Sequence, residues 1–168
     1  MEHRIEHIEK KLMTGKRLLM SFSSDRTREL WQSFMPVRKE ITNCKSIDLY
    51  SMQIYPLLFF HDFNPDAPFE KWAAIEVEDH SIVPEGMETC VLPGGLYAVF
   101  LYRGSSSAAS ETFRYILGTW LPASEYILDL RPHFEILGEK YKNDDPGSEE
   151  EIWIPIKPRE WNYRPPCK

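Results

Sequence analysis

The chain has 168 residues, of which 42% are hydrophobic and 27% are charged, and its formal net charge is −6. This length fits one domain or two small fused halves, and it supports a core without disulfide bonds. The negative charge argues against direct binding to nucleic acid, because phosphate recognition needs a basic face. The charged N-terminus has no apolar signal core, and no apolar run is long enough to span a membrane, so we expect a cytoplasmic protein.

The first 80 residues predict one helix and three strands. Leu30, Trp31 and Phe34 have helical spacing, and Pro36 is expected to kink or end that helix. Gly15 marks a potential break in the strand that precedes this helix. Alternating apolar residues predict the strands. The first half therefore contains, in order, a predicted strand at 4–22, a helix at about 25–40, and strands at 46–55 and 69–79.

The second half repeats this order after a turn at 84–86. Pro132 interrupts one of its strands, which suits a sheet edge or a bulge. The acidic run at 144–151 is interpreted as a solvated turn that lacks calcium-loop spacing. The predicted elements are a strand bent within 87–102, a helix at 106–120, and strands at 126–137 and 150–156.

Each half thus runs strand, helix, strand, strand, which predicts an α+β fold with a curved antiparallel sheet and two main helices. The repeats are expected at about 4–80 and 87–157 of one domain, 1–157, and the Pro-rich residues 158–168 as a surface tail. Two such units side by side can enclose a central cleft that binds a ligand. A single domain with a solid core fits the pattern equally well.

The second half carries a family resemblance. GLYAVFLYRG (95–104) is followed by a helix that ends at Trp120-Leu121-Pro122, then by Arg131-Pro132 before Phe134-Glu135, and finally by EEIWIPI (150–156). These stretches resemble the GyrI-like domain, and ELWQSFMPVRKEI (29–41) is similar to the first helix of that family. The resemblance implies two strand–helix–strand–strand repeats around a pocket for hydrophobic, often cationic, planar molecules, with the pocket glutamate at Glu135.

The alternation in HFEIL places His133, Glu135 and Leu137 on one face of a strand, with Phe134 and Ile136 on the other. If Phe134 and Ile136 pack on a helix, Glu135 faces the concave side. A carboxylate in an apolar cleft is costly unless a cation pairs with it, and a ligand can supply that cation. The alternative is an exposed Glu135 that pairs with Arg131 or with a lysine.

Aromatic residues make up 13% of the chain, which is typical of a generously packed core and also of an aromatic-lined cavity. Aromatic faces attract cations, so they are the expected neighbours of Glu135 in a pocket. Each is also an ordinary core residue. The residues predicted to line the site with Glu135 are Trp153, Trp72, Tyr50, Tyr97, Trp120, Leu137 and Met52.

Three functions are compatible with the sequence. The first is binding of hydrophobic, cationic small molecules, with a role in transcription regulation through a separate DNA-binding partner. The second is a hydrolase of strained-ring natural products in which Glu135 is catalytic and a neighbouring tyrosine, Tyr126 or Tyr97, assists. The third is a gyrase-inhibitor-like module that binds a protein. We expect no metal and no cofactor, because the five histidines and three cysteines show no ligand spacing and no phosphate loop is present. The oligomeric state stays open.

Overall fold

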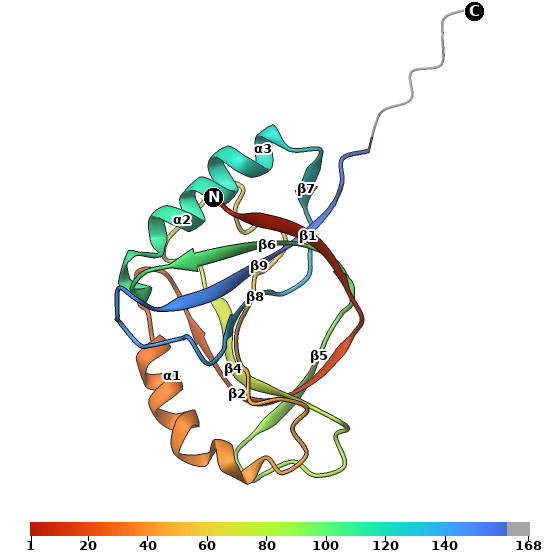
Figure 1. Cartoon of the computed structure of the whole chain (residues 1–168), viewed down its shortest axis with the longest axis vertical. Coiled ribbons are helices and arrows are strands. Elements are labelled where there is room, and N and C mark those ends of the chain that lie inside the picture. The colour runs from red at the N-terminus through yellow and green to blue at the C-terminus, as the bar shows by residue number, and fades with distance from the viewer. Residues whose placement is uncertain (161–168) are drawn as a thin grey trace, which may run out of the picture.

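The computed structural model describes residues 1–160, which form a nine-stranded antiparallel sheet with two main helical segments (Figure 1). The strands are β1 (His3–Ile8), β2 (Lys11–Met20), β3 (Leu49–Ile54), β4 (Phe69–Val77), β5 (Glu88–Leu92), β6 (Gly95–Arg103), β7 (Tyr126–Leu128), β8 (His133–Leu137) and β9 (Glu149–Pro158). The helices are α1 (Thr27–Phe34) with the 3₁₀ segment η1 (Met35–Glu40), and a second run of η2 (Ser106–Ala108), α2 (Ser110–Tyr115), the π segment η3 (Ile116–Trp120) and α3 (Leu121–Ala123).

The strand order shows that the chain is built from two matching halves. The order is β1-β6-β9-β8-β3-β4-β2-β5, and β7 pairs with β9 outside this path. The corresponding strands β3 and β8, which follow the helical segments of the two halves, meet at the centre. On either side, the strands of the second half (β6, β9, β8) mirror those of the first (β2, β4, β3). The predicted α+β fold of two strand–helix–strand–strand repeats is therefore confirmed.

The two halves also exchange strands at the edges of the sheet. β1 pairs with β6 and continues into β2, while β5 pairs with β2 and continues into β6. The result is a long two-stranded ribbon that curves around one side of the sheet (Figure 1). The sheet and the ribbon together form a ring, and both helical segments lie outside it.

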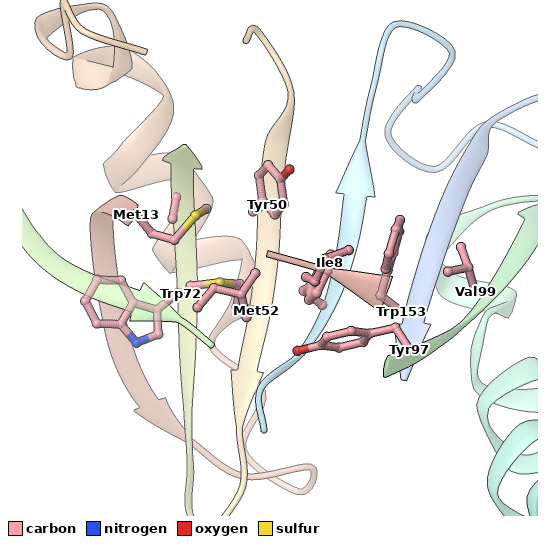
Figure 2. Packing of buried hydrophobic residues seen from close by; sticks show 11 residues of the cluster. Ile8, Met13, Tyr50, Met52, Trp72, Tyr97, Val99 and Trp153 are labelled. Carbon is pink, nitrogen blue, oxygen red and sulfur yellow. The ribbon is translucent and has the colours of Figure 1, made fainter. Parts of the chain in front are cut away.

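The side chains that face the ring interior form one apolar cluster, which we call the ring core (Figure 2). Its five aromatic members are buried to 5% exposure or less and come from β3, β4, β6, β8 and β9. Phe134 stacks on Trp153 with ring centroids 5.2 Å apart and meets Tyr97 edge-on at 5.1 Å. The ring core consists of Ile8, Met13, Tyr50, Met52, Trp72, Ala74, Leu92, Tyr97, Val99, Phe134 and Trp153.

The opposite face of the sheet carries the helices. Leu30 and Phe34 of α1 pack on Ala73 and Ile75 of β4. The second helical run packs on β6 and β9 through a separate cluster that includes Phe100, Ile116, Ile152 and Ile154. The central strands β3 and β8 lie between these two clusters. The inner face of the sheet is therefore covered by one apolar cluster, and the helix-bearing face by two clusters with the central strands between them.

One strand break lies elsewhere than predicted, whereas the end of the first α-helix follows the expectation from Pro36. The first strand breaks at residues 9–10 rather than at Gly15, because the chain passes there from the partner β6 to the partner β4. Gly15 instead lies inside β2, where a Cβ atom would collide with the carbonyl oxygen of Ala73. The first helix changes to 3₁₀ geometry at residue 35, because Pro36 lacks the N–H that an α-helix needs.

The predicted surface tail falls mostly outside the described residues, since β9 ends at Pro158 and the description ends at residue 160. Within the described part, no helix is long and apolar enough to cross a membrane.

Candidate functional site

Glu135 lies on the face of the sheet that carries the helices. It is directly opposite Ser51 of β3 and Ile152 of β9, and Ile152 belongs to the cluster beneath the second helical run. The prediction that Phe134 and Ile136 would meet a helix, with Glu135 on the concave side, is wrong. Phe134 is in the ring core and Ile136 packs against it. Alternation separates two faces, but it cannot tell which one meets a helix when both are apolar.

The Glu135 carboxylate is buried at 8% exposure. The Gln53 side-chain amide donates a hydrogen bond of 2.9 Å to its Oε2 atom. Burial raises the pKa of Glu135, and Lys71 and Gln53 oppose that rise only in part. Lys71 is directly opposite Gln53 on β4, and no ion pair joins it to the carboxylate among residues 1–160. The small side chains of Ser51 and Ala73 extend the row of Glu135 across β3 and β4.

A second acidic side chain lies on the same face. Because Glu135 is opposite Ile152, Glu150 occupies the diagonal position on β9, within reach of a long side chain. Burial and the charge of Glu135 raise the pKa of Glu150 to about 7. Among residues 1–160, no ion pair involves either carboxylate. The prediction of a solvated acidic turn is therefore wrong for Glu150, and a register count from Ile152 would have found it.

Aromatic rings flank Glu135 on its other side. His133, two residues earlier on the same face, meets Tyr55 edge-on at 4.9 Å and Phe60 at 5.8 Å. Burial lowers the pKa of His133 to about 3, so its ring is neutral. Burial, followed by the charge of Glu135, raises the pKa of Tyr55. Tyr55 and Phe60 belong to a group of contacting rings that we call the aromatic cluster. It consists of Phe22, Tyr55, Phe59, Phe60, Phe63 and Phe69.

Most of the aromatic residues predicted to surround Glu135 lie on the other side of the sheet. Figure 2 shows five predicted residues within the ring core: Tyr50, Met52, Trp72, Tyr97 and Trp153. The structure therefore does not bring them together with the Glu135 carboxylate. They were predicted from the strands that carry them, and the strand alone does not tell on which face of the sheet a side chain lies.

The remaining predicted residues are Leu137, Trp120 and Tyr126, and they lie in three different places. Leu137 shares the face of Glu135 and is opposite Leu49. Trp120 packs edge-on against Phe100 of β6, at 5.0 Å and two strands from β8. Tyr126 is opposite Pro158, six residues along β9 from the partner of Glu135, which corresponds to about 20 Å of strand. Tyr126 therefore cannot assist Glu135 as predicted.

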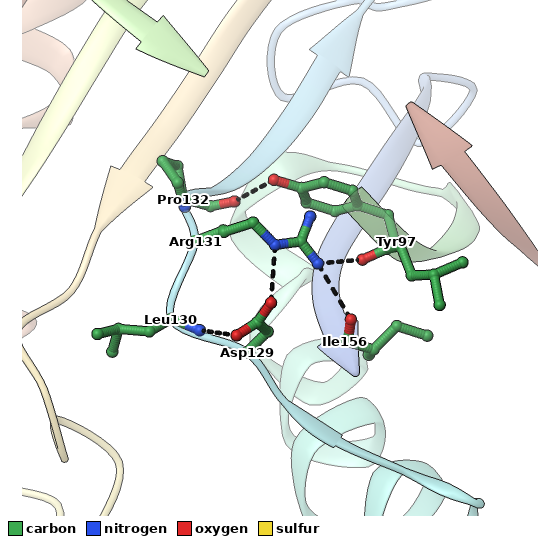
Figure 3. Close-up of polar contacts among 7 residues, drawn as sticks. Tyr97, Asp129, Leu130, Arg131, Pro132 and Ile156 are labelled. Carbon is green, nitrogen blue, oxygen red and sulfur yellow. Dashed lines mark hydrogen bonds and ion pairs between the residues drawn. The ribbon is translucent and has the colours of Figure 1, made fainter. Parts of the chain in front are cut away.

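The residues just before β8 are fixed by Arg131 (Figure 3). Its guanidinium donates to the carboxylate of Asp129 at 2.9 Å and to the carbonyl oxygens of Leu96 and Ile156. It also lies over the ring of Tyr97 at 4.6 Å, and the Tyr97 hydroxyl donates to the carbonyl of Pro132. These contacts join the turn before β8 to β6 and β9, and thereby support the register that positions Glu135.

Two surface pockets lie away from Glu135. One, of about 140 Å³, lies between β2, α1 and Gly86, and another, of about 210 Å³, lies beside His3 and Glu151. Neither is lined by Glu135. Residues 1–160 also contain no group of His, Cys, Asp and Glu that is placed to hold a metal ion.

Two fused strand–helix–strand–strand units with a buried acidic group between their helices define a duplicated small-molecule-binding domain. The chain belongs to the GyrI-like family: the model of the GyrI-like small molecule binding domain matches residues 1–157. The transcriptional regulator BrlR of Pseudomonas aeruginosa is 26% identical over 146 residues. That match covers 86% of this chain and 51% of BrlR, so the chain spans about half the length of this curated relative.

Solved structures share the fold. SAV2435, solved bound to tetraphenylphosphonium, superposes with a TM-score of 0.69 at 14% identity and 94% coverage of both chains. A hydrolase encoded by lin2189 of Listeria innocua superposes with a TM-score of 0.58 at 12% identity, covering 93% of this chain and 92% of that one. At such identities the likeness establishes the fold alone.

Proposed function

We propose that this domain binds hydrophobic cationic small molecules on the helix-bearing face of its sheet, with Glu135 as the partner of the positive charge. The observation that carries the proposal is a buried carboxylate without an ion pair among the described residues, next to neutral aromatic rings. A buried, unpaired carboxylate is costly, and a bound cation removes that cost. BrlR is a transcriptional regulator, and SAV2435 was solved with an organic cation, which agrees with this class of ligand.

Aromatic faces next to the carboxylate would add to the affinity. Each cation–π contact contributes about 0.5–2 kcal/mol, depending on how dry the site is. Tyr55 and Phe60 are the nearest rings of the aromatic cluster, since both contact His133. In this proposal they take the role that the sequence assigned to the tryptophans of the ring core.

Ligand entry requires side chains to move, and the turn-rich segment 56–68 is the proposed point of entry. It connects β3 to β4 beside the aromatic cluster. Leu58 has φ of 60° and Asp62 has φ of 51°, a left-handed conformation that a leucine rarely adopts. Leu57, Leu58 and Phe63 of this segment are exposed. A strained segment with exposed apolar side chains can rearrange at low cost.

Calorimetric titration with tetraphenylphosphonium tests the proposal. We expect the wild type to bind and Glu135→Gln to bind at least tenfold more weakly, which is about 1.4 kcal/mol. Glu151→Gln is the matched control, because it removes the same charge from β9 on the opposite face, next to Arg4. Equal affinity of the wild type and Glu135→Gln would overturn the role of Glu135.

A hydrolase is the second candidate, and the raised pKa of Glu135 favours it. A carboxyl whose pKa is moved towards neutrality can exchange protons with a substrate at physiological pH. The fold is shared with the lin2189 hydrolase. Tyr55, rather than Tyr126, is the tyrosine placed to assist. Turnover of strained-ring electrophiles that is lost in Glu135→Gln would support this activity, and no turnover by the wild type across a broad panel would exclude it.

The biological role that fits the binding proposal is effector recognition in transcription regulation. The DNA-binding element of such a system would be a separate region or a separate protein. A gyrase-like protein partner is the alternative. Capture of a DNA-binding protein that depends on tetraphenylphosphonium would support the first and exclude a ligand-independent partner.

A further inference from the structure

Glu150 lies on the strand next to Glu135, and the proposed function gives it no role. The two carboxylates come from adjacent strands, lie on one face, and are separated by a single diagonal step of the register. Charges of the same sign at such a separation disfavour each other's ionisation, and burial adds to the effect. In the absence of a cation, the pair is therefore most stable when it retains one proton.

The groups around the pair do not relieve this repulsion. The charge of Lys71 on β4 acts on both carboxylates, and Lys71 forms no ion pair with either within the described chain. His133 is neutral, and the pKa values of the neighbouring tyrosines are raised by burial. The charge of Glu111 contributes to the raised pKa of Tyr102, and the charge of Asp144 contributes to the raised pKa of Tyr141. The groups that face the pair from β3, β4, β6, β8 and the 138–148 loop are Gln53, Tyr55, Lys71, Tyr102, His133 and Tyr141.

We infer that cation binding at this site is coupled to the release of one proton, and that Glu150 is the residue that makes this exchange. The inference rests on the proposed function. A bound positive charge offsets the repulsion between the carboxylates and favours the doubly ionised pair, so the shared proton leaves to solvent as the ligand enters. The net charge of the site is then unchanged by binding. Neutral ligands of the same shape gain nothing from this exchange, so the pair also selects for charge.

The exchange predicts a specific pH profile. Below the midpoint near pH 7, the affinity for a permanent cation should rise by up to about tenfold per pH unit, and above it the affinity should level off. Tetraphenylphosphonium is a suitable probe because its own charge does not titrate. Triphenylphosphine oxide, which is neutral, should show no such slope.

The experiment is titration calorimetry with tetraphenylphosphonium from pH 5.5 to 8.5, repeated in buffers of different ionisation enthalpy. The wild type should release close to one proton per ligand at pH 6 and almost none at pH 8.5. Glu150→Gln should still bind through Glu135, with a markedly smaller proton release and a shallower pH profile than the wild type, because only Glu135, whose own pKa burial raises, is left to titrate. Glu149→Gln, on the same strand but paired with Arg103, should keep the wild-type slope.

The outcomes separate the two proposals. Wild-type binding without a pH slope and without proton release would overturn the inference and leave the proposed function standing. A slope in Glu150→Gln as steep as that of the wild type would overturn the assignment to Glu150. No binding of tetraphenylphosphonium by the wild type at any pH would overturn the proposed function itself.

Discussion

Replacing Glu150 by glutamine should make the free protein more stable above neutral pH. The folded state raises the pKa of Glu150 from 4.5 to about 7, because burial and Glu135 disfavour the charged form. A raised carboxyl pKa means that the folded state binds the proton more tightly than the unfolded state. The associated stability is complete below pH 4.5 and is lost as the pH rises through about 7.

The pKa shift sets the size of the effect. At 1.36 kcal/mol per pKa unit, the wild type loses up to about 3 kcal/mol between pH 4.5 and pH 8, and partial exposure of the side chain reduces this to about 2 kcal/mol. Glutamine keeps the shape of the side chain and cannot ionise. We therefore expect Glu150→Gln to be about 2 kcal/mol more stable than the wild type at pH 8, and close to it at pH 4.5.

Urea denaturation followed by tryptophan fluorescence, at several pH values between 4.5 and 8.5, measures this difference. Glu149→Gln is the control with the opposite sign: burial alone would raise the pKa of Glu149, but hydrogen bonds and ion pairs with Arg103 and Lys140 lower it overall. A Glu150→Gln protein that is no more stable than the wild type at pH 8 would refute the reasoning.

Three further substitutions test the fold. Phe134→Ala removes a ring buried to 1% exposure and should cost about 3–5 kcal/mol of unfolding free energy, measured by urea denaturation. Gly15→Ala should lower the melting temperature because its Cβ would meet the Ala73 carbonyl. The control Gly118→Ala has open space around the new Cβ and should raise the melting temperature slightly. Equal shifts of the two melting temperatures would contradict the packing of β2. Arg131→Met should destabilise the domain by about 2–4 kcal/mol, since three hydrogen bonds are lost, and an unchanged denaturation midpoint would show that Arg131 does not hold the turn before β8.

The order of elements could be predicted because each half repeats the same sequence pattern. Alternating segments gave the strands, and the helical spacing of Leu30, Trp31 and Phe34 gave the first helix. The position of a strand break was harder to predict. Glycine weakens a strand by propensity, but Gly15 serves a close approach of two backbones, and that approach depends on the tertiary partner β4.

The location of the site was only half predictable. The sequence indicated Glu135 as the candidate carboxylate, but the face on which it lies depends on how the sheet closes. The ribbon of β1–β2 and β5–β6 buries Phe134 and Ile136 on the inner side, so a strand between two apolar layers offers no pattern that distinguishes inside from outside.

Glu150 was missed for a related physical reason. Three consecutive glutamates are typical of a solvated turn, and their different roles appear only after the register of β9 is known. Glu149 and Glu151 alternate with Glu150 along the strand, and they form ion pairs with Arg103 and Arg4. Glu150 has no such partner among the described residues and lies beside Glu135. Long-range pairing between β8 and β9 therefore decides the chemistry of the acidic run.

The central claim is that an organic cation binds next to Glu135 on the helix-bearing face. A crystal structure with tetraphenylarsonium tests it most directly, because the anomalous signal of arsenic locates the cation without prior assumptions. We predict an arsenic peak beside the Glu135 carboxylate, with phenyl groups against Tyr55 and Phe60. A peak inside the ring core, next to Trp72 and Trp153, or only on the outer surface, would contradict the account.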